Sequence, residues 1–150
     1  MSELSVRPRV LGIDYGRTRI GVAISDELQM LAHPLETIST APAKAAVARV
    51  AEIARSNVVE RIIVGLPRHM NGSLGISADD ALAFAETLRP LVRCEVTMCD
   101  ERLSTMAANR ALQEAGRKTR NTRGVVDQVA AQVILQSYLD RSTSARAPDL

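Results

Sequence analysis

The chain has 150 residues, with 19 Lys and Arg against 17 Asp and Glu, which gives a formal net charge of +2. Apolar residues make up 46% of the chain and aromatic residues only 2%, so Val, Ile, Leu and Ala must form the core, and no aromatic platform exists for stacking unpaired bases. No apolar run reaches the roughly 20 residues that cross a bilayer, and the N-terminus has no signal-peptide pattern. We therefore expect a cytoplasmic protein with no membrane partner.

The first third of the chain predicts three strands and a helix. Apolar residues 10–15 and 19–25 flank a short turn that contains glycine, the pattern of a β-hairpin. The extended stretch 30–38 contains Pro34, which cannot donate to a sheet ladder, so we expect an edge strand there. Ala-rich residues 43–55 predict a helix.

The rest of the chain alternates between strands and helices. The continuous apolar run at 61–65 is typical of a strand buried on both faces. A helix is predicted at 77–91, a strand at 94–99, and two further helices at 103–115 and 125–139. Three leading strands followed by this alternation predict an α/β domain with a mixed sheet.

Polar segments at both ends of the chain delimit one domain. Residues 1–8 and 142–150 have the composition of flexible tails. A single domain is therefore expected at 9–141, a length that can bury a substantial core.

Positive charge is concentrated in one short segment. Residues 117–123, RKTRNTR, carry four positive charges and no acid, so the remainder of the chain has a net charge of −2. A loop that contacts phosphates needs such local charge. The plainer alternative is a solvated basic loop.

Three carboxylates stand at the ends of predicted elements. Asp14 closes the first strand, Glu101 follows the strand 94–99, and Asp127 lies in the first turn of the last helix. Asp127 begins an apolar stripe at helical spacing, so its carboxylate should face the protein. A single acid at such a position is more often a cap, which is the plainer alternative for Asp127.

Convergence of these three ends would bring the three carboxylates close enough to repel one another and to raise at least one pKa. Mg²⁺ or Mn²⁺ removes the repulsion, because both cations take oxygen ligands. Two such ions about 4 Å apart can activate a water and stabilise the leaving oxygen in phosphodiester cleavage. The acids and the nearby basic segment therefore predict metal-dependent phosphoryl transfer.

Four motifs make the pattern specific. They are LGIDYGRTRIGVAISD, IIVGLPRHMNGSLG, DERLST and VVDQVAAQVILQSYLD. In order and spacing they resemble the YqgF/RuvX family, bacterial ribonuclease H-like proteins described as Holliday junction resolvases and as nucleases that mature the 5′ end of pre-16S rRNA. The resemblance covers about residues 9–140. It departs at Ser104, where the family usually has Thr, and at Asn71, where Asp is common.

The resemblance implies a catalytic and metal-binding set at Asp14, Glu101 and Asp127. It implies a ribonuclease H-like fold, in which three antiparallel strands lead into a parallel portion of a five-stranded sheet flanked by helices. It also implies divalent-metal catalysis with Mg²⁺ or Mn²⁺, expected here as two ions. Branched DNA or pre-rRNA is the implied substrate, and a homodimer is the implied assembly.

Basic residues are predicted to contact the nucleic acid. Arg17 and Arg19 flank Asp14 and would hold a scissile phosphate beside the metal, unless they are simply exposed turn residues. The full set of predicted contacts is Arg17, Arg19, Arg68, Arg117, Lys118, Arg120 and Arg123.

Two other functions remain open at the level of sequence. DYGRTRIGVA also resembles the first phosphate-binding hairpin of the actin and sugar-kinase superfamily, but those proteins clamp ATP between two such domains, and this chain has the length of one. The second alternative is a non-catalytic module that binds nucleic acid or the ribosome, although the modest net charge disfavours tight binding by the chain alone.

Overall fold

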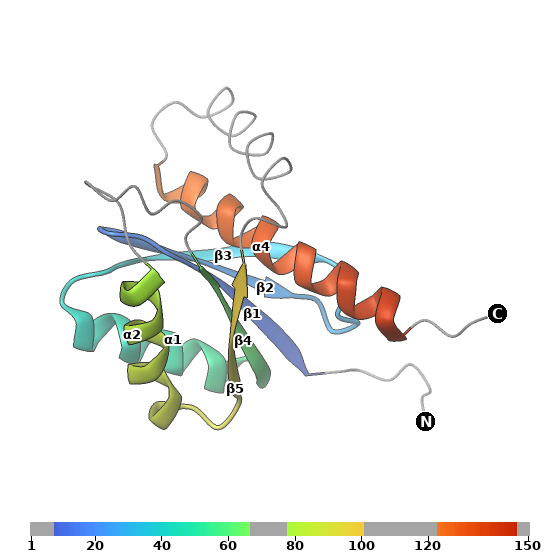
Figure 1. The fold of residues 1–150 in the computed structure, drawn as a ribbon, viewed down its shortest axis with the longest axis horizontal. Coiled ribbons are helices and arrows are strands. Elements are labelled where there is room, and N and C mark those ends of the chain that lie inside the picture. The colour runs from blue at the N-terminus through green and yellow to red at the C-terminus, as the bar shows by residue number, and fades with distance from the viewer. Residues whose placement is uncertain (1–7, 67–77, 101–122, 147–150) are drawn as a thin grey trace.

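The computed structural model describes residues 8–66, 78–100 and 123–146, and it shows a five-stranded sheet with helices on both faces (Figure 1). In chain order the elements are β1 (Arg9–Tyr15), β2 (Arg19–Ser25), β3 (Ala32–Ser39), α1 (Ala43–Ser56), β4 (Val59–Leu66), α2 (Ala78–Leu88), the short 3-10 helix η1 (Arg89–Leu91), β5 (Glu95–Asp100) and α4 (Arg123–Arg146). The predicted helix 103–115 lies outside the described residues.

The strands lie in the order β3-β2-β1-β4-β5. β1 pairs antiparallel with β2, and β2 with β3, whereas β1 with β4 and β4 with β5 are parallel. This order confirms an α/β fold with a mixed sheet, in which three antiparallel strands precede a parallel portion. β3, which contains Pro34, is an edge strand as predicted.

Side-chain alternation divides the sheet into two packed faces. α1 and α2 cover one face, and α4 crosses the other (Figure 1). On β1, Leu11 and Ile13 are buried in the cluster with α1 and α2, whereas Val10 belongs to the cluster with Leu135 of α4. Because successive side chains of a strand alternate between faces, Asp14 points to the same side as Val10, toward α4.

Glutamines fasten α4 to the edge strand β3. Gln132 donates to the carbonyl oxygen of Ala32, and the Ala32 backbone N–H donates to the side-chain oxygen of Gln136, both at 2.9 Å. Gln128 donates to the Thr37 hydroxyl at 2.9 Å. Residues four apart share one side of a helix, so these bonds fix the direction in which α4 crosses the sheet.

The C-terminal segment differs from the prediction. α4 continues to Arg146, whereas a flexible tail was expected from residue 142. Residues 142–146 contain no glycine or proline, and the first helix-breaking residue after them is Pro148, so the helix has no local reason to end earlier. Neither α4 nor any other helix in the described ranges is long and apolar enough to cross a membrane.

Candidate active site

Asp14 lies at the carboxyl end of β1, the central strand of the sheet. In the β1–β2 ladder it stands directly opposite Gly21. Residues directly opposite each other in an antiparallel pair project to the same face. Gly21, which has no side chain, therefore leaves the surface open beside the Asp14 carboxylate on the side of α4.

The main chain of α4 occupies that opening. A Cβ atom at Gly21 would overlap the carbonyl carbon and oxygen of Asp127 and would lie 3.1 Å from the Asp127 Cβ. The Asp127 backbone thus rests directly on β2, one strand away from Asp14, and only glycine permits so close an approach. Two acids that are far apart in the sequence are brought together at this edge of the sheet.

The surroundings of Asp14 disfavour its charged form. Burial, and after it the nearby charge of Asp127, raise the pKa of Asp14 from the ordinary 3.8 to about 6. Among the residues that the structure describes, no hydrogen-bond donor lowers the pKa of Asp14. A carboxylate in this condition at neutral pH gains strongly from a bound cation, because the cation offsets both the lost hydration and the repulsion.

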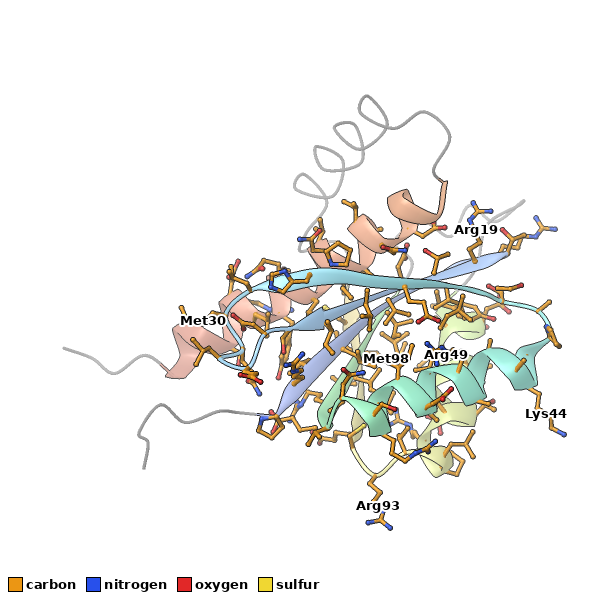
Figure 2. All side chains as sticks on the ribbon, turned by 180° about the vertical axis from the view of Figure 1, so that it is seen from behind. Arg19, Met30, Lys44, Arg49, Arg93 and Met98 are labelled. Carbon is orange, nitrogen blue, oxygen red and sulfur yellow. The ribbon has the colours of Figure 1, made fainter. Side chains whose placement is uncertain are left out.

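Arg19 pairs with the second acid. Its Nε donates to Oδ2 of Asp127 at 2.7 Å, and the two side chains are 38% and 22% exposed. Arg19 begins β2 and shares a face with Gly21, which directs its guanidinium toward α4; Figure 2 shows it at one end of the molecule. This predicted nucleic-acid contact therefore has a carboxylate partner. Arg17, in the turn between β1 and β2, is exposed.

The remaining predicted site residues are placed only in part. Five of them lie outside the described ranges: Arg68, Glu101, Arg117, Lys118 and Arg120. Arg123 is the first residue of α4. β5 runs parallel to β4 and β1 and ends at Asp100. The chain therefore leaves β5 at the same end of the sheet as Asp14. Within the described residues, no three His, Cys, Asp or Glu side chains are grouped so that they could hold a metal ion.

The role of Gly21 was not predicted from the sequence. A glycine inside an otherwise apolar strand often marks a close approach of another backbone, so RIGVAIS contained a usable signal. The bond between Arg19 and Asp127 had no such signal, because it joins positions 108 residues apart in the chain.

The sequence matches a known protein family and named bacterial proteins. A family model described as "RuvX: Holliday junction resolvase" matches residues 8–141. A protein of Moorella thermoacetica named "Putative pre-16S rRNA nuclease" is 49% identical over 133 residues, which covers 89% of this chain and 95% of that protein. A protein of Bacillus cereus with the same name is 44% identical over 135 residues, covering 89% and 98%.

Solved structures share the fold at low sequence identity. RuvC of T. thermophilus, solved in complex with a Holliday junction substrate, superposes with a TM-score of 0.64 at 21% identity and covers 95% of this chain and 99% of that one. The fowlpox virus Holliday junction resolvase superposes with a TM-score of 0.52 at 14% identity, covering 89% and 99%. The sheet and its helices are thus those of RuvC-like resolvases of the ribonuclease H fold.

Proposed function

Because the chain belongs to the RuvX family, we propose that it is a divalent-metal-dependent endonuclease that hydrolyses phosphodiester bonds in structured nucleic acid. The observation that carries the proposal is the burial of Asp14 close to the charge of Asp127, which together raise the pKa of Asp14 to about 6. Two crowded carboxylates at the end of a central strand are the oxygen ligands that Mg²⁺ and Mn²⁺ prefer. The residues present therefore fit such cations.

Glu101 is the proposed third acid. Cys99, two residues before it, packs in the cluster on the α4 face, where Asp14 also points. β1 and β5 are separated by two strand spacings, about 10 Å. This is a span that carboxylates from both strands can bridge around bound cations.

Each residue has a distinct role in this proposal. Bound Mg²⁺ or Mn²⁺, expected as two ions, would activate a water and stabilise the leaving oxygen. Asp14, Glu101 and Asp127 would hold these ions, and Arg19 would orient Asp127 through its 2.7 Å bond. Arg17, which is exposed in the turn that follows β1, would hold the phosphate of the substrate. The outlying contacts proposed for the nucleic-acid backbone are Arg68, Arg117, Lys118, Arg120 and Arg123.

The substrate proposed from the relatives is a Holliday junction, pre-16S rRNA, or both. A four-way junction has two-fold symmetry, so paired cuts would need a homodimer with two active sites. Maturation of one RNA end needs only one site. The oligomeric state in solution therefore bears on the choice between the two substrates.

A cleavage assay with both substrates tests the proposal. The purified protein is given a synthetic four-way DNA junction or a transcript that spans the 5′ end of 16S rRNA, with Mg²⁺ and Mn²⁺ supplied separately. We expect cleavage of at least one substrate, and its loss on addition of EDTA. Asp127→Asn should abolish it, whereas Asp140→Asn, an exposed change on the same helix, should leave it intact.

A binding measurement separates metal binding from turnover. Millimolar Mg²⁺ or Mn²⁺ should raise the melting temperature of the wild type, because a ligand that binds only the folded state stabilises it. The same addition should leave Asp14→Asn and Asp127→Asn unchanged. Undiminished cleavage by a folded Asp14→Asn protein would rule out the proposed mechanism.

A further inference from the structure

A pocket of about 510 Å³ lies between the last turns of α1, the start of β4 and the chain that enters β5. Its floor contains Ala51 and Ala54, and its rim contains Arg55, Val58, Leu91 and Arg93; we call it the far-end pocket. In the parallel β1–β4 pair, Val59 lies beside Arg9. The pocket is therefore at the amino end of the parallel strands, five residues or about 16 Å along β1 from Asp14.

Exposed apolar side chains border this pocket. Val58 is 71% exposed and Leu91 51% exposed. Ala51 and Ala54, which are both buried, line the hollow with side chains that end at Cβ. Apolar groups next to a hollow leave water that a fitting side chain can displace.

Val58 is also held in a costly backbone conformation. Its φ is 53°, in the left-handed region that β-branched residues avoid. It follows Asn57, the C-cap of α1, and glycine or asparagine is the usual residue at such a position. Burial of the side chain does not offset this strain, since Val58 is largely exposed. An exposed, strained apolar residue is a reason to look for a function.

Two guanidinium groups at the rim lack acidic partners among the described residues. The acids near them in the sequence are engaged elsewhere: Glu52 with Arg49, Glu60 with Gln29, Glu95 with Arg61, and Glu86 with Arg89. Arg55 lies in the last turn of α1, where a positive charge favours the helix dipole. That explanation does not extend to Arg93, which projects from the molecule well away from Arg19 (Figure 2).

We propose that the far-end pocket docks an acidic peptide segment of a partner protein. A large apolar side chain of the segment would enter between Val58 and Leu91, and flanking carboxylates would pair with Arg55 and Arg93. The pocket favours a peptide over a small ligand, because its charged groups are on the exposed rim and its floor is apolar. Arginine beside exposed apolar groups is typical of protein interfaces. A partner bound at the far-end pocket would leave the end of the sheet where Asp14 lies free for nucleic acid.

Binding of a designed peptide tests the proposal. The probe is a fluorescein-labelled heptapeptide, Glu-Asp-Phe-Glu-Asp-Leu-Glu, measured by anisotropy and mapped by backbone NMR shifts on the ¹⁵N-labelled protein. One control peptide has Ala in place of Phe and Leu, and another has Lys in place of every acid. We expect saturable binding of the first peptide only, with the largest shifts at the residues that line the pocket.

Variants of the chain sharpen the test. The double variant Arg55→Glu/Arg93→Glu should lower the affinity for the acidic peptide about tenfold or more and raise the affinity for the Lys peptide. Lys44→Glu, at the opposite end of α1, should change neither affinity. Val58→Asn should raise the melting temperature by about 2 to 4 °C because it relieves the strain. The same variant should lower the affinity for the acidic peptide by about fivefold or more.

Several results would overturn the proposal. Absence of saturable binding at 1 mM peptide, or shifts confined to other surfaces, would do so. Binding that survives the double charge reversal would equally contradict it. A concentration-dependent dimer that Arg93→Glu abolishes would show that a second copy of the chain occupies the pocket. Nuclease activity should be unchanged in all four variants, so failure here is distinguishable from failure of the proposed nuclease.

Discussion

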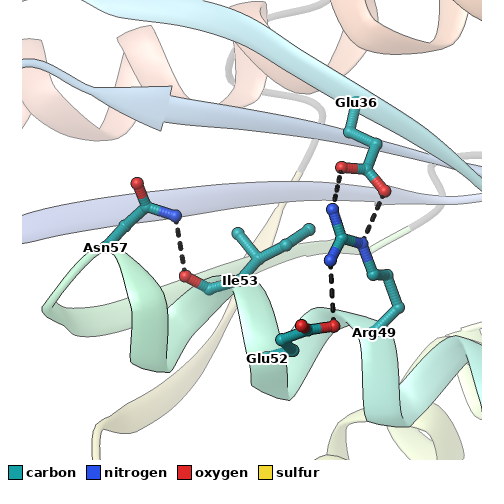
Figure 3. Close-up of polar contacts among 5 residues, drawn as sticks. All are labelled: Glu36, Arg49, Glu52, Ile53 and Asn57. Carbon is teal, nitrogen blue, oxygen red and sulfur yellow. Dashed lines mark hydrogen bonds and ion pairs between the residues drawn. The ribbon is translucent and has the colours of Figure 1, made fainter.

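Two arginine–carboxylate contacts of equal length have different surroundings. On the side of α1, Arg49 holds Glu36 of β3 through two bonds of 2.7 Å and also donates to Glu52 at 2.9 Å (Figure 3). At the carboxyl end of β1, Arg19 holds Asp127 through one bond of 2.7 Å, and Asp14 lies beside that pair. The first group joins an edge strand to a helix. The second joins Arg19 to an acid whose charge also acts on the buried Asp14.

The pKa shifts of the acids run in opposite directions. Hydrogen bonding from Arg49 lowers the pKa of Glu36, as expected for a carboxylate whose charge is compensated. Burial and the charge of Asp127 raise the pKa of Asp14. The length of an ion pair therefore does not distinguish a structural contact from a candidate functional site, whereas a charge left destabilised near neutral pH does.

Replacement of Asp14 by Asn should have the largest effect. Cleavage should be abolished, while the free energy of unfolding at pH 7 should rise by up to about 3 kcal/mol, the equivalent of the pKa shift. The raised pKa means that the native state binds more protons than the unfolded state between pH 4 and 6, so ionised Asp14 destabilises the fold above that range. Urea unfolding at pH 7 and at pH 4 measures the free energy of unfolding above and below this titration.

The gain from this substitution should shrink below about 1 kcal/mol at pH 4, where Asp14 is protonated in the native state and about two-fifths protonated in the unfolded state. Asp140→Asn, which removes an exposed charge from α4, is the control and should change neither quantity appreciably. A variant that unfolds more easily than the wild type at pH 7 would show that Asp14 is compensated rather than destabilised.

Alanine at Gly21 should have the next largest effect. The added methyl overlaps the backbone of Asp127 and should displace the first turn of α4, which would lower cleavage by about a hundredfold. The matched control is Gly12→Ala, whose Cβ would meet Leu135 Cβ at 2.6 Å farther along the same helix. Both should cost about 1 to 3 kcal/mol of stability. Equal loss of cleavage per folded molecule in the two variants would refute a positioning role for Gly21.

These contacts show how far the sequence could predict the molecule. Apolar runs and Pro34 were sufficient to predict five strands and the edge position of β3, because those signals are local. Asp14 could be placed at the end of β1 for the same reason. The approach of Asp127 depends on the direction of α4 across the sheet, which is set by glutamine bonds to β3 that no local pattern reveals.

The far-end pocket could not be predicted at all. Val58 follows a helix and precedes a strand, and an exposed valine at such a junction is unremarkable in sequence. Its positive φ results from the tight connection between α1 and β4, in which its backbone N–H donates to the carbonyl of Arg55. The partners of nearby acids are likewise set by tertiary packing, as for Glu95 with Arg61.

Replacement of Arg19 should lower nuclease activity, whereas replacement of Arg49 should not. Arg19→Gln frees Asp127 from its orienting bond and should lower kcat/KM by about tenfold. Arg49→Gln removes the bonds to Glu36 and should leave kcat/KM unchanged. Because all the charges are partly exposed, each variant should lower the melting temperature by only about 3 °C or less. Cleavage kinetics under excess metal, with melting curves of the same samples, make this comparison.

The smallest predicted effect is the pH dependence of Glu36, and its sign is opposite to that of Asp14. A lowered pKa means that the ionised form stabilises the native state above the unfolded value of about 4.5, and that this contribution is lost as the pH falls through the native pKa. Glu36→Gln should therefore melt about 1 to 3 °C below the wild type at pH 7 and approach it only as the pH falls below about 4.5 through the lowered native pKa. Asp14→Asn should melt above the wild type at pH 7 and approach it at higher pH than Glu36→Gln does, as the pH falls from about 6 to about 4. If both variants shifted in one direction at pH 7, the contrast between a compensated and a crowded carboxylate would be wrong.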